Sequence, residues 1–207
     1  MVAAFSLPPV SPPPAPRPGE ARVRLSGVPW DTYVALSDAV TSPGVRMTFY
    51  RGELEIMTLS QEHEEAKTIL ARLIEMYAVE CDVPLRGYGS TTFRSAMKAH
   101  GLEPDECYCV GHELTSVPDL AVEVVLTSGG IEKLPVYAGL GVAEVWFWEN
   151  DELSPYALLP GHGYESIPAS LVLPDLDLGM VASLVRRGDQ LEAVRSFHAW
   201  LRGGRRG

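Results

Sequence analysis

Two segments of the chain place acidic residues where an acid is costly. Glu123 stands inside residues 120–126, whose other members are all apolar, and Asp105 stands at the start of another expected strand. A carboxylate within an apolar strand needs a hydrogen-bonding partner or a metal ion. These two acids are therefore the first candidates for chemistry. The alternative is an edge strand on which Glu123 faces water.

The strand that carries Glu123 is expected to be covered on both faces. Its neighbours at 120–122 and 124–125 are apolar at odd and even positions alike. This pattern is typical of a strand packed between two layers. It favours the functional interpretation of Glu123 over the edge strand.

The spacing of strands decides which acids can share one ion. Asp119 and Glu123 lie on one face of the same strand, about 13 Å apart at a rise of about 3.3 Å per residue. Asp105 can lie beside Glu123, because paired strands are only about 4.8 Å apart. Carboxylate oxygens that converge within a few ångström suit Mg²⁺ or Mn²⁺. We predict Asp105 and Glu123 as metal ligands, with Asp119 as a reserve ligand.

Two basic side chains are candidates to accompany these acids. Position 125 would face the same way as Glu123, but it is Val125. Lys133 is the nearest downstream lysine, and a helix after the strand could return it to the same end of the sheet; most lysines are instead solvated. His63, near the start of a helix, could add a ligand or a proton-transfer group. The sequence alone favours a surface position for His63.

The predicted elements alternate strands with helices, which indicates the α/β class. Helices are predicted at 30–40, 60–81, about 132–139, 178–185 and 191–201. Strands are predicted as a hairpin at 45–58, a strand pair across 84–94, single strands at 106–110, 120–126 and 142–148, and a second hairpin at 156–167. Residues 97–101 are expected to form a loop.

Length and composition fit a globular protein. The 207 residues suit one domain, expected at 21–202, with a disordered Pro-rich tail at 1–20 and a flexible tail at 203–207. No apolar stretch is long enough to cross a bilayer, and the N-terminus lacks the basic start of a signal peptide. The three cysteines form no disulfide framework and no spacing for structural zinc. We expect a cytoplasmic protein with no membrane partner.

The formal net charge is −10. Proteins that grip nucleic acid through its phosphates usually carry a basic patch. The acidic total lowers the expectation of a nucleic-acid partner without excluding a local basic surface.

At these residues the chain resembles a known family. It carries Glu103-Pro104-Asp105, then Pro-Asp-Leu-Ala-Val-Glu-Val at 118–124, then Lys133 and the segment 137–146. This ordered combination, with 52–57 and His63 upstream, is similar to the bacterial putative restriction endonuclease family of the PD-(D/E)xK nuclease superfamily. The resemblance covers about 30–184.

The resemblance implies a restriction-endonuclease-like core, with a central mixed β-sheet flanked by helices and extra β-hairpins. It implies that Asp105 and Glu123 are the acids of the two motif strands. The superfamily's usual lysine, two residues after the glutamate, is replaced by Val125, and Lys133 on the following helix matches it instead. His63 or Glu64 matches the helix-borne accessory position.

The function that the resemblance implies is Mg²⁺- or Mn²⁺-dependent cleavage of nucleic acid, with DNA favoured. Lys133 would orient the attacking water or stabilise developing charge. A homodimer could build a basic cleft that includes Arg86, Arg94 and Lys98. Two alternatives stay open: a catalytically inactive nuclease fold used for dimerisation or interaction, and a metal-dependent hydrolase of another phosphoester.

Overall fold

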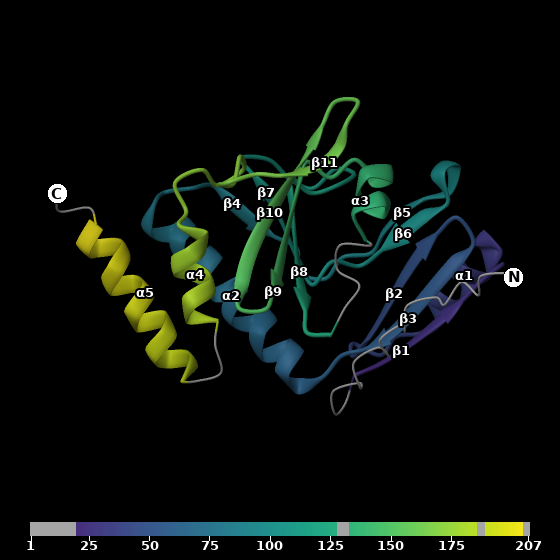
Figure 1. Ribbon diagram of the computed structural model, residues 1–207, viewed down its shortest axis with the longest axis horizontal. Coiled ribbons are helices and arrows are strands. Elements are labelled where there is room, and N and C mark those ends of the chain that lie inside the picture. The colour runs from purple at the N-terminus through teal and green to yellow at the C-terminus, as the bar shows by residue number, and fades with distance from the viewer. Residues whose placement is uncertain (1–19, 128–132, 186–188, 205–207) are drawn as a thin grey trace, which may run out of the picture.

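Two β-sheets and their helices make up the chain, and Figure 1 shows the computed structural model. The structure describes residues 20–127, 133–185 and 189–204. The larger sheet has the strand order β11-β10-β9-β8-β7-β4, and the smaller sheet has the order β1-β3-β2-β6-β5. The predicted α/β class is confirmed, but two separate sheets replace the expected single sheet with added hairpins.

The element bounds follow chain order. The strands of the larger sheet are β4 (Leu85–Gly87), β7 (Glu106–Val110), β8 (Leu120–Val125), β9 (Glu144–Glu149), β10 (Glu152–Leu159) and β11 (Gly163–Ser166). Those of the smaller sheet are β1 (Ala21–Leu25), β2 (Val45–Tyr50), β3 (Glu53–Thr58), β5 (Phe93–Ser95) and β6 (His100–Leu102). The helices are α1 (Trp30–Ala39), α2 (Gln61–Glu80), the 3₁₀ turn η1 (Ala96–Lys98), α3 (Leu134–Leu140), α4 (Leu178–Leu184) and α5 (Gln190–Gly204).

Strand β8 lies inside the larger sheet and is buried at every position. It pairs parallel with β9 and antiparallel with β7, so the larger sheet is mixed. Its even-numbered residues pack against α2, α4 and α5, while Ala121 and Val125 pack against α3. Because side chains alternate along a strand, Glu123 belongs to the α3 face. The prediction that this strand is covered on both faces is confirmed.

The smaller sheet lies on the α3 side of the larger one (Figure 1). The smaller sheet has its own hydrophobic core, in which Tyr33 of α1 stacks on Phe49 of β2 with ring centroids 4.8 Å apart. Helix α3 contacts β6, and a Cβ built on Gly139 would lie 1.4 Å from Nδ1 of His100. Gly139 therefore permits the close approach of α3 to the smaller sheet.

Several predicted elements are confirmed. The hairpin at 45–58 forms with Arg51 and Gly52 between its strands. The long helix begins after Ser60, whose hydroxyl accepts a hydrogen bond from the backbone N–H of His63 at 3.1 Å. Helix α3 is one to two residues displaced from its predicted range, and Glu132 lies outside the described residues. The second hairpin, β10–β11, is longer than predicted, and β9 pairs with β10 as well.

Two predictions between 84 and 101 are wrong. Strands β4 and β5 do not pair with each other: β4 pairs with β7, and β5 pairs with β6 in the other sheet. Residues 97–101 are not a plain loop, since they contain the end of η1 and the start of β6. Strands of three residues are too short to show an alternating pattern, so the sequence offers no periodicity here.

The ends of the expected domain also differ in detail. Glu20, assigned to the tail, is buried, and residues 1–19 lie outside the described residues. Helix α5 continues to Gly204, beyond the expected boundary at 202. Within the described ranges, no helix combines the length and apolar character that crossing a membrane requires.

Candidate active site

The two predicted acids meet across neighbouring strands. The register of β7 and β8 pairs Glu106 with Val122, so Asp105 stands opposite Glu123. The Asp105 Oδ2 atom accepts a hydrogen bond from the backbone N–H of Val124 at 2.8 Å. Asp105 is 2% exposed and Glu123 is 1% exposed. The predicted proximity of these two residues is present in the structure.

Glu123 receives two donors from the start of α3. Lys133 Nζ lies 2.8 Å from Glu123 Oε2, and the hydroxyl of Tyr137 donates to Oε1. Lys133 is itself only 8% exposed, so the alternative of a solvated surface lysine is wrong. The four-residue spacing places Lys133 and Tyr137 on one side of the helical turn, and both reach the same carboxylate.

Asp105 has a basic partner of its own. His63 Nε2 lies 3.2 Å from Asp105 Oδ2 and 3.1 Å from the carbonyl oxygen of Val124. His63 is 1% exposed, so the surface position favoured by the sequence alone is wrong. The first turn of α2 faces the ends of β7 and β8, and this brings the imidazole to the acids.

Burial and charge shift the pKa of these groups in opposite directions. Burial alone would raise the pKa of Asp105, but the hydrogen bond and charge of His63, with the charge of Lys133, hold it below its usual value. Burial and the neighbouring Asp105 raise the pKa of Glu123. Burial would lower the pKa of Lys133, but Glu123 and Asp105 outweigh it and raise it. Lys133 therefore stays an ammonium, the form that best offsets the repulsion between two acids.

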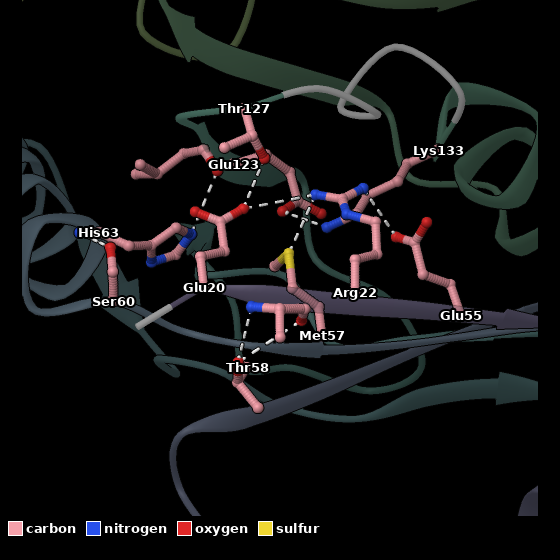
Figure 2. Close-up of polar contacts among 12 residues, drawn as sticks. Glu20, Arg22, Glu55, Met57, Thr58, Ser60, His63, Glu123, Thr127 and Lys133 are labelled. Atoms are coloured by element: carbon pink, nitrogen blue, oxygen red, sulfur yellow. Dashed lines mark hydrogen bonds and ion pairs between the residues drawn. The ribbon is translucent and has the colours of Figure 1, made fainter. Parts of the chain in front are cut away.

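The smaller sheet contributes residues that sequence reasoning missed. Figure 2 shows Arg22 of β1 and Glu55 of β3 pointing towards Lys133 and Glu123. Arg22 Nη1 lies 3.0 Å from Glu55 Oε1. The charge of Glu55 also helps to raise the pKa of Lys133. The candidate site therefore lies between the two sheets.

Glu20 is a third acid of this region. Its Oε1 atom accepts a hydrogen bond from Thr127 Oγ1 at 2.6 Å, and Arg22 Nη2 lies 3.7 Å from the same oxygen. Thr127 follows the end of β8, so Glu20 joins the β1 side of the site to the Glu123 strand. The proline-rich surroundings of Glu20 favoured a tail, and no local pattern in the sequence could have placed it here.

Two buried polar atoms at this site lack a hydrogen-bond partner among the described residues. They are Oε2 of Glu20 and Nδ1 of His63. A buried polar atom without a hydrogen bond costs about 1–3 kcal/mol, and such atoms are uncommon in folded proteins. These atoms suit a site that receives a further polar group, such as a hydrated cation.

Two other predicted residues make separate contacts. Asp119, the reserve ligand, precedes β8 at the opposite end from Glu123, and its Oδ2 accepts from the backbone N–H of Val110 at 2.9 Å. Glu64 pairs with Lys67 at 3.0 Å through Oε2, and its Oε1 atom is buried without a hydrogen-bond partner among the described residues.

The described residues do not bring Arg86 and Arg94 together in a basic cleft within one chain. Arg86 pairs with Glu113 at 3.1 Å, and Arg94 pairs with Asp38 at 2.8 Å. Their strands, β4 and β5, belong to different sheets. The side chain of Lys98 lies outside the described residues.

The chain is similar to a known protein family and to a solved structure. Residues 30–186 match the model of the Uma2 family, described as "Putative restriction endonuclease". A solved structure described as a putative nuclease belonging to DUF820, from Anabaena variabilis ATCC 29413, is 13% identical to the chain. The match covers 84% of this chain and 99% of the solved chain, with a TM-score of 0.46. No curated protein matches the chain.

The family match begins at α1 and ends just after α4. It therefore contains Asp105 just before β7, Glu123 on β8 and Lys133 just before α3. It confirms the family resemblance found in the sequence. Because the match spans most of the 207 residues, the chain belongs to the Uma2 family, "Putative restriction endonuclease".

Proposed function

We propose that this protein is a metal-dependent nuclease that hydrolyses phosphodiester bonds of nucleic acid, with DNA as the favoured substrate. One observation carries the proposal. Asp105 and Glu123 lie opposite each other on adjacent strands, both are buried, and Lys133 contacts Glu123 at 2.8 Å. Family membership supports the same reaction class, and we propose that β7, β8 and the start of α3 form its restriction-endonuclease-like core.

The donor atoms suit Mg²⁺ or Mn²⁺, which prefer carboxylate and carbonyl oxygens. Asp105 and Glu123 would hold the ion, and Glu20, whose Oε2 has no partner among the described residues, is a third carboxylate for it. Each carboxylate oxygen has two lone pairs, so Glu123 can keep Lys133 while it binds a metal. When bound, the ion would lower the pKa of a coordinated water and polarise the phosphoryl oxygen.

The basic residues have separate roles in this proposal. Lys133, held as an ammonium by Glu123, would orient the attacking water or stabilise the negative charge that develops on the phosphoryl group. His63 would hold the Asp105 carboxylate in place and transfer protons. Tyr137, whose pKa is raised well above its usual value by burial and Glu123, stays a neutral donor that fixes the orientation of Glu123.

The proposed partners follow from the reaction and from charge. The chain carries a net charge of −10, so a long duplex needs a local basic surface or the metal ion itself. We propose a homodimer, and edge strand β1, with Val23 and Leu25 exposed, is where a second copy would pair. Cys81, Cys107 and Cys109 are free thiols, which supports a cytoplasmic setting.

A second candidate rests on a specific feature of the same site. Both oxygens of Glu123 are already hydrogen-bonded, to Lys133 and Tyr137, and Asp105 is paired with His63. A buried acid that has a basic partner can persist without a metal. The alternative is therefore a nuclease-like fold that serves as an interaction module and cleaves nothing.

Cleavage assays separate the two candidates. Supercoiled plasmid, single-stranded DNA and RNA would be incubated with Mg²⁺ or Mn²⁺ and the wild-type chain, Glu123→Gln or Lys133→Met. We expect metal-dependent cleavage by the wild type and a loss of about 100-fold or more in each variant. Glu165→Gln, on the exposed strand β11, is the matched acid control and should cleave normally. Cleavage of no substrate by the wild type would favour the interaction module.

A further inference from the structure

Outside the candidate active site, three potential metal ligands converge at the other end of β7 and β8. They are the thiol of Cys109, the imidazole of His112 and the carboxylate of Asp119, and one ligand atom from each lies within 4.8 Å of the other two. Cys109 is on β7, His112 is in the following loop and Asp119 immediately precedes β8. The strand pair therefore brings together residues ten positions apart in sequence.

The two ring nitrogens of His112 each face an acceptor oxygen. Its Nδ1 faces the carbonyl oxygen of Glu113 at 2.9 Å, and its Nε2 faces Asp119 Oδ2 at 2.9 Å. A neutral imidazole has one donor and one acceptor, so it cannot donate to both oxygens. Either the ring carries a second proton, or a cation takes the place of that proton between Nε2 and the carboxylate.

The contact between His112 Nδ1 and the Glu113 carbonyl resembles the hydrogen bond that metal-binding histidines make with their other ring nitrogen. Such a histidine donates its other N–H to a carbonyl or carboxylate, which fixes the tautomer and leaves a lone pair for the metal. Here the Glu113 carbonyl would accept a hydrogen bond from Nδ1–H, which leaves the lone pair of Nε2 free for a metal. The backbone N–H of Val110 bonds Asp119 Oδ2 at 2.9 Å, which orients the carboxylate towards the ring.

We propose that Cys109, His112 and Asp119 form a binding site for a Zn²⁺-type transition-metal ion, separate from the carboxylate site at Glu123. A thiolate, an imidazole and a carboxylate together favour Zn²⁺ over Mg²⁺ or Mn²⁺. Tetrahedral ligands at about 2.0–2.3 Å from zinc lie roughly 3.3–3.7 Å apart, so small side-chain rotations complete the site.

The fourth position of the ion would be open to solvent. The His112 side chain is 51% exposed and that of Asp119 is 32% exposed, whereas Cys109 is fully buried beneath them. A bound ion would fasten the loop between β7 and β8 to the end of the sheet. Asp105 immediately precedes β7 and lies four residues before Cys109, about 13 Å at the rise of an extended chain, so the two sites do not share ligands.

Cobalt spectroscopy tests this site without reference to nuclease activity. Untagged, metal-stripped, reduced full-length chain would be titrated with Co²⁺, which reports a thiolate ligand by a charge-transfer band in the near ultraviolet, and with Zn²⁺ by calorimetry. We expect the band in the wild type and its loss in Cys109→Ser. Zn²⁺ affinity should fall by about tenfold or more in both Cys109→Ser and His112→Ala. His112→Ala removes an exposed side chain, so its fold should be intact.

Matched controls make the result specific. Cys81→Ser, which changes the cysteine at the end of α2, should keep the charge-transfer band and the Zn²⁺ affinity. Glu123→Gln should keep both as well. Zn²⁺ should also raise the melting temperature of the wild type but not of Cys109→Ser, because an ion that binds only the folded state stabilises it. A wild type without the band, or Zn²⁺ binding unchanged in Cys109→Ser and His112→Ala, would overturn the proposal.

Discussion

At the residue scale, each buried acid of the candidate site is held by a different basic group. Glu123 has Lys133, and Asp105 has His63. Removing one partner of a buried ion pair leaves an uncompensated charge, which costs more than the pair itself contributes. Stability and the proposed activity therefore depend on the same contacts, and measurements on each side chain have to separate the two.

The His63 imidazole should titrate above its ordinary pKa of 6.5. Burial lowers this pKa, but the hydrogen bond and charge of Asp105 outweigh burial and raise it. Asp105→Asn removes that charge, so NMR titration of the His63 ring should give a lower pKa in the variant. An unchanged midpoint would contradict the pairing.

The same shift sets a pH dependence of stability. A raised histidine pKa stabilises the folded state fully below pH 6.5, and the contribution disappears as pH rises through the folded-state pKa of His63. The lowered pKa of Asp105 contributes above pH 3.8, and that contribution disappears as pH falls through its folded-state value. Urea unfolding should therefore show His63→Gln costing more stability below pH 6.5 than above the His63 pKa. An equal cost at both would argue against a charged pair.

Lys133→Met should destabilise the fold by about 3–5 kcal/mol, because Glu123 loses its charged partner while it stays buried. Tyr137→Phe removes one hydrogen bond to Glu123 and should cost less, about 1–3 kcal/mol. Urea unfolding of both variants measures these differences. If Lys133→Met were as stable as the wild type, Glu123 would have to be neutral or solvated, against its burial.

The local sequence is enough to identify Asp105 and Glu123 as candidate site residues. It does not predict that their partners are buried. Glu123 stands out because its neighbours are apolar at both parities. His63 and Glu20 sit in polar or proline-rich surroundings, so local patterns favour solvent for both. Only contacts between distant segments, α2 with β8 and β1 with Thr127, bring them to the site.

At the element scale, the approach of α3 to the smaller sheet positions Lys133 and Tyr137. Gly139 lies on α3, and His100 on β6 fills the space where a side chain at 139 would be. Strong periodic elements such as α2 and the β2–β3 hairpin follow directly from sequence. The three-residue strands β4, β5 and β6 do not, because their pairing is decided by tertiary contacts.

Gly139→Ala should loosen this contact, since the new Cβ would lie 1.4 Å from Nδ1 of His100. Overpacking of this kind costs about 1–3 kcal/mol or more, and displacement of α3 should also reduce cleavage. Thermal unfolding measures the first effect and the cleavage assay the second.

Gly203→Ala is the matched control, because Gly203 lies in α5 with nothing within 4 Å of the new Cβ. That substitution should be neutral or stabilise by up to about 1 kcal/mol. Equal destabilisation by the two substitutions would show that the contact with His100 is not responsible.

At the scale of the whole molecule, the candidate site lies between the two sheets. The protein as a whole is acidic, with a net charge of −10. Arg22, Arg24 and Arg94 are each paired with a carboxylate, which reduces the positive charge that these three residues offer to phosphates. Proteins that make 6–10 phosphate contacts lose affinity steeply as salt rises. In the proposed reaction, the metal ion would supply much of the attraction to the phosphates.

Duplex DNA should therefore bind weakly without divalent metal and with a shallow salt dependence. We expect a slope of log K against log salt of about −3 or less steep, which corresponds to about three phosphates or fewer. Fluorescence polarisation with the non-cleaving Glu123→Gln variant measures it. A slope as steep as −8 or so would reveal a basic surface that the described residues do not provide.

The most direct test of the central claim is calorimetric titration of Mn²⁺ into the wild-type chain, Asp105→Asn, Glu123→Gln and the Glu165→Gln control. The proposed nuclease site predicts binding by the wild type and the control, and loss of that binding in both site variants. Cys109→Ser should leave it unchanged. No binding by the wild type, or binding that survives both Asp105→Asn and Glu123→Gln, would contradict the metal-dependent mechanism and leave an interaction module with a nuclease-like fold.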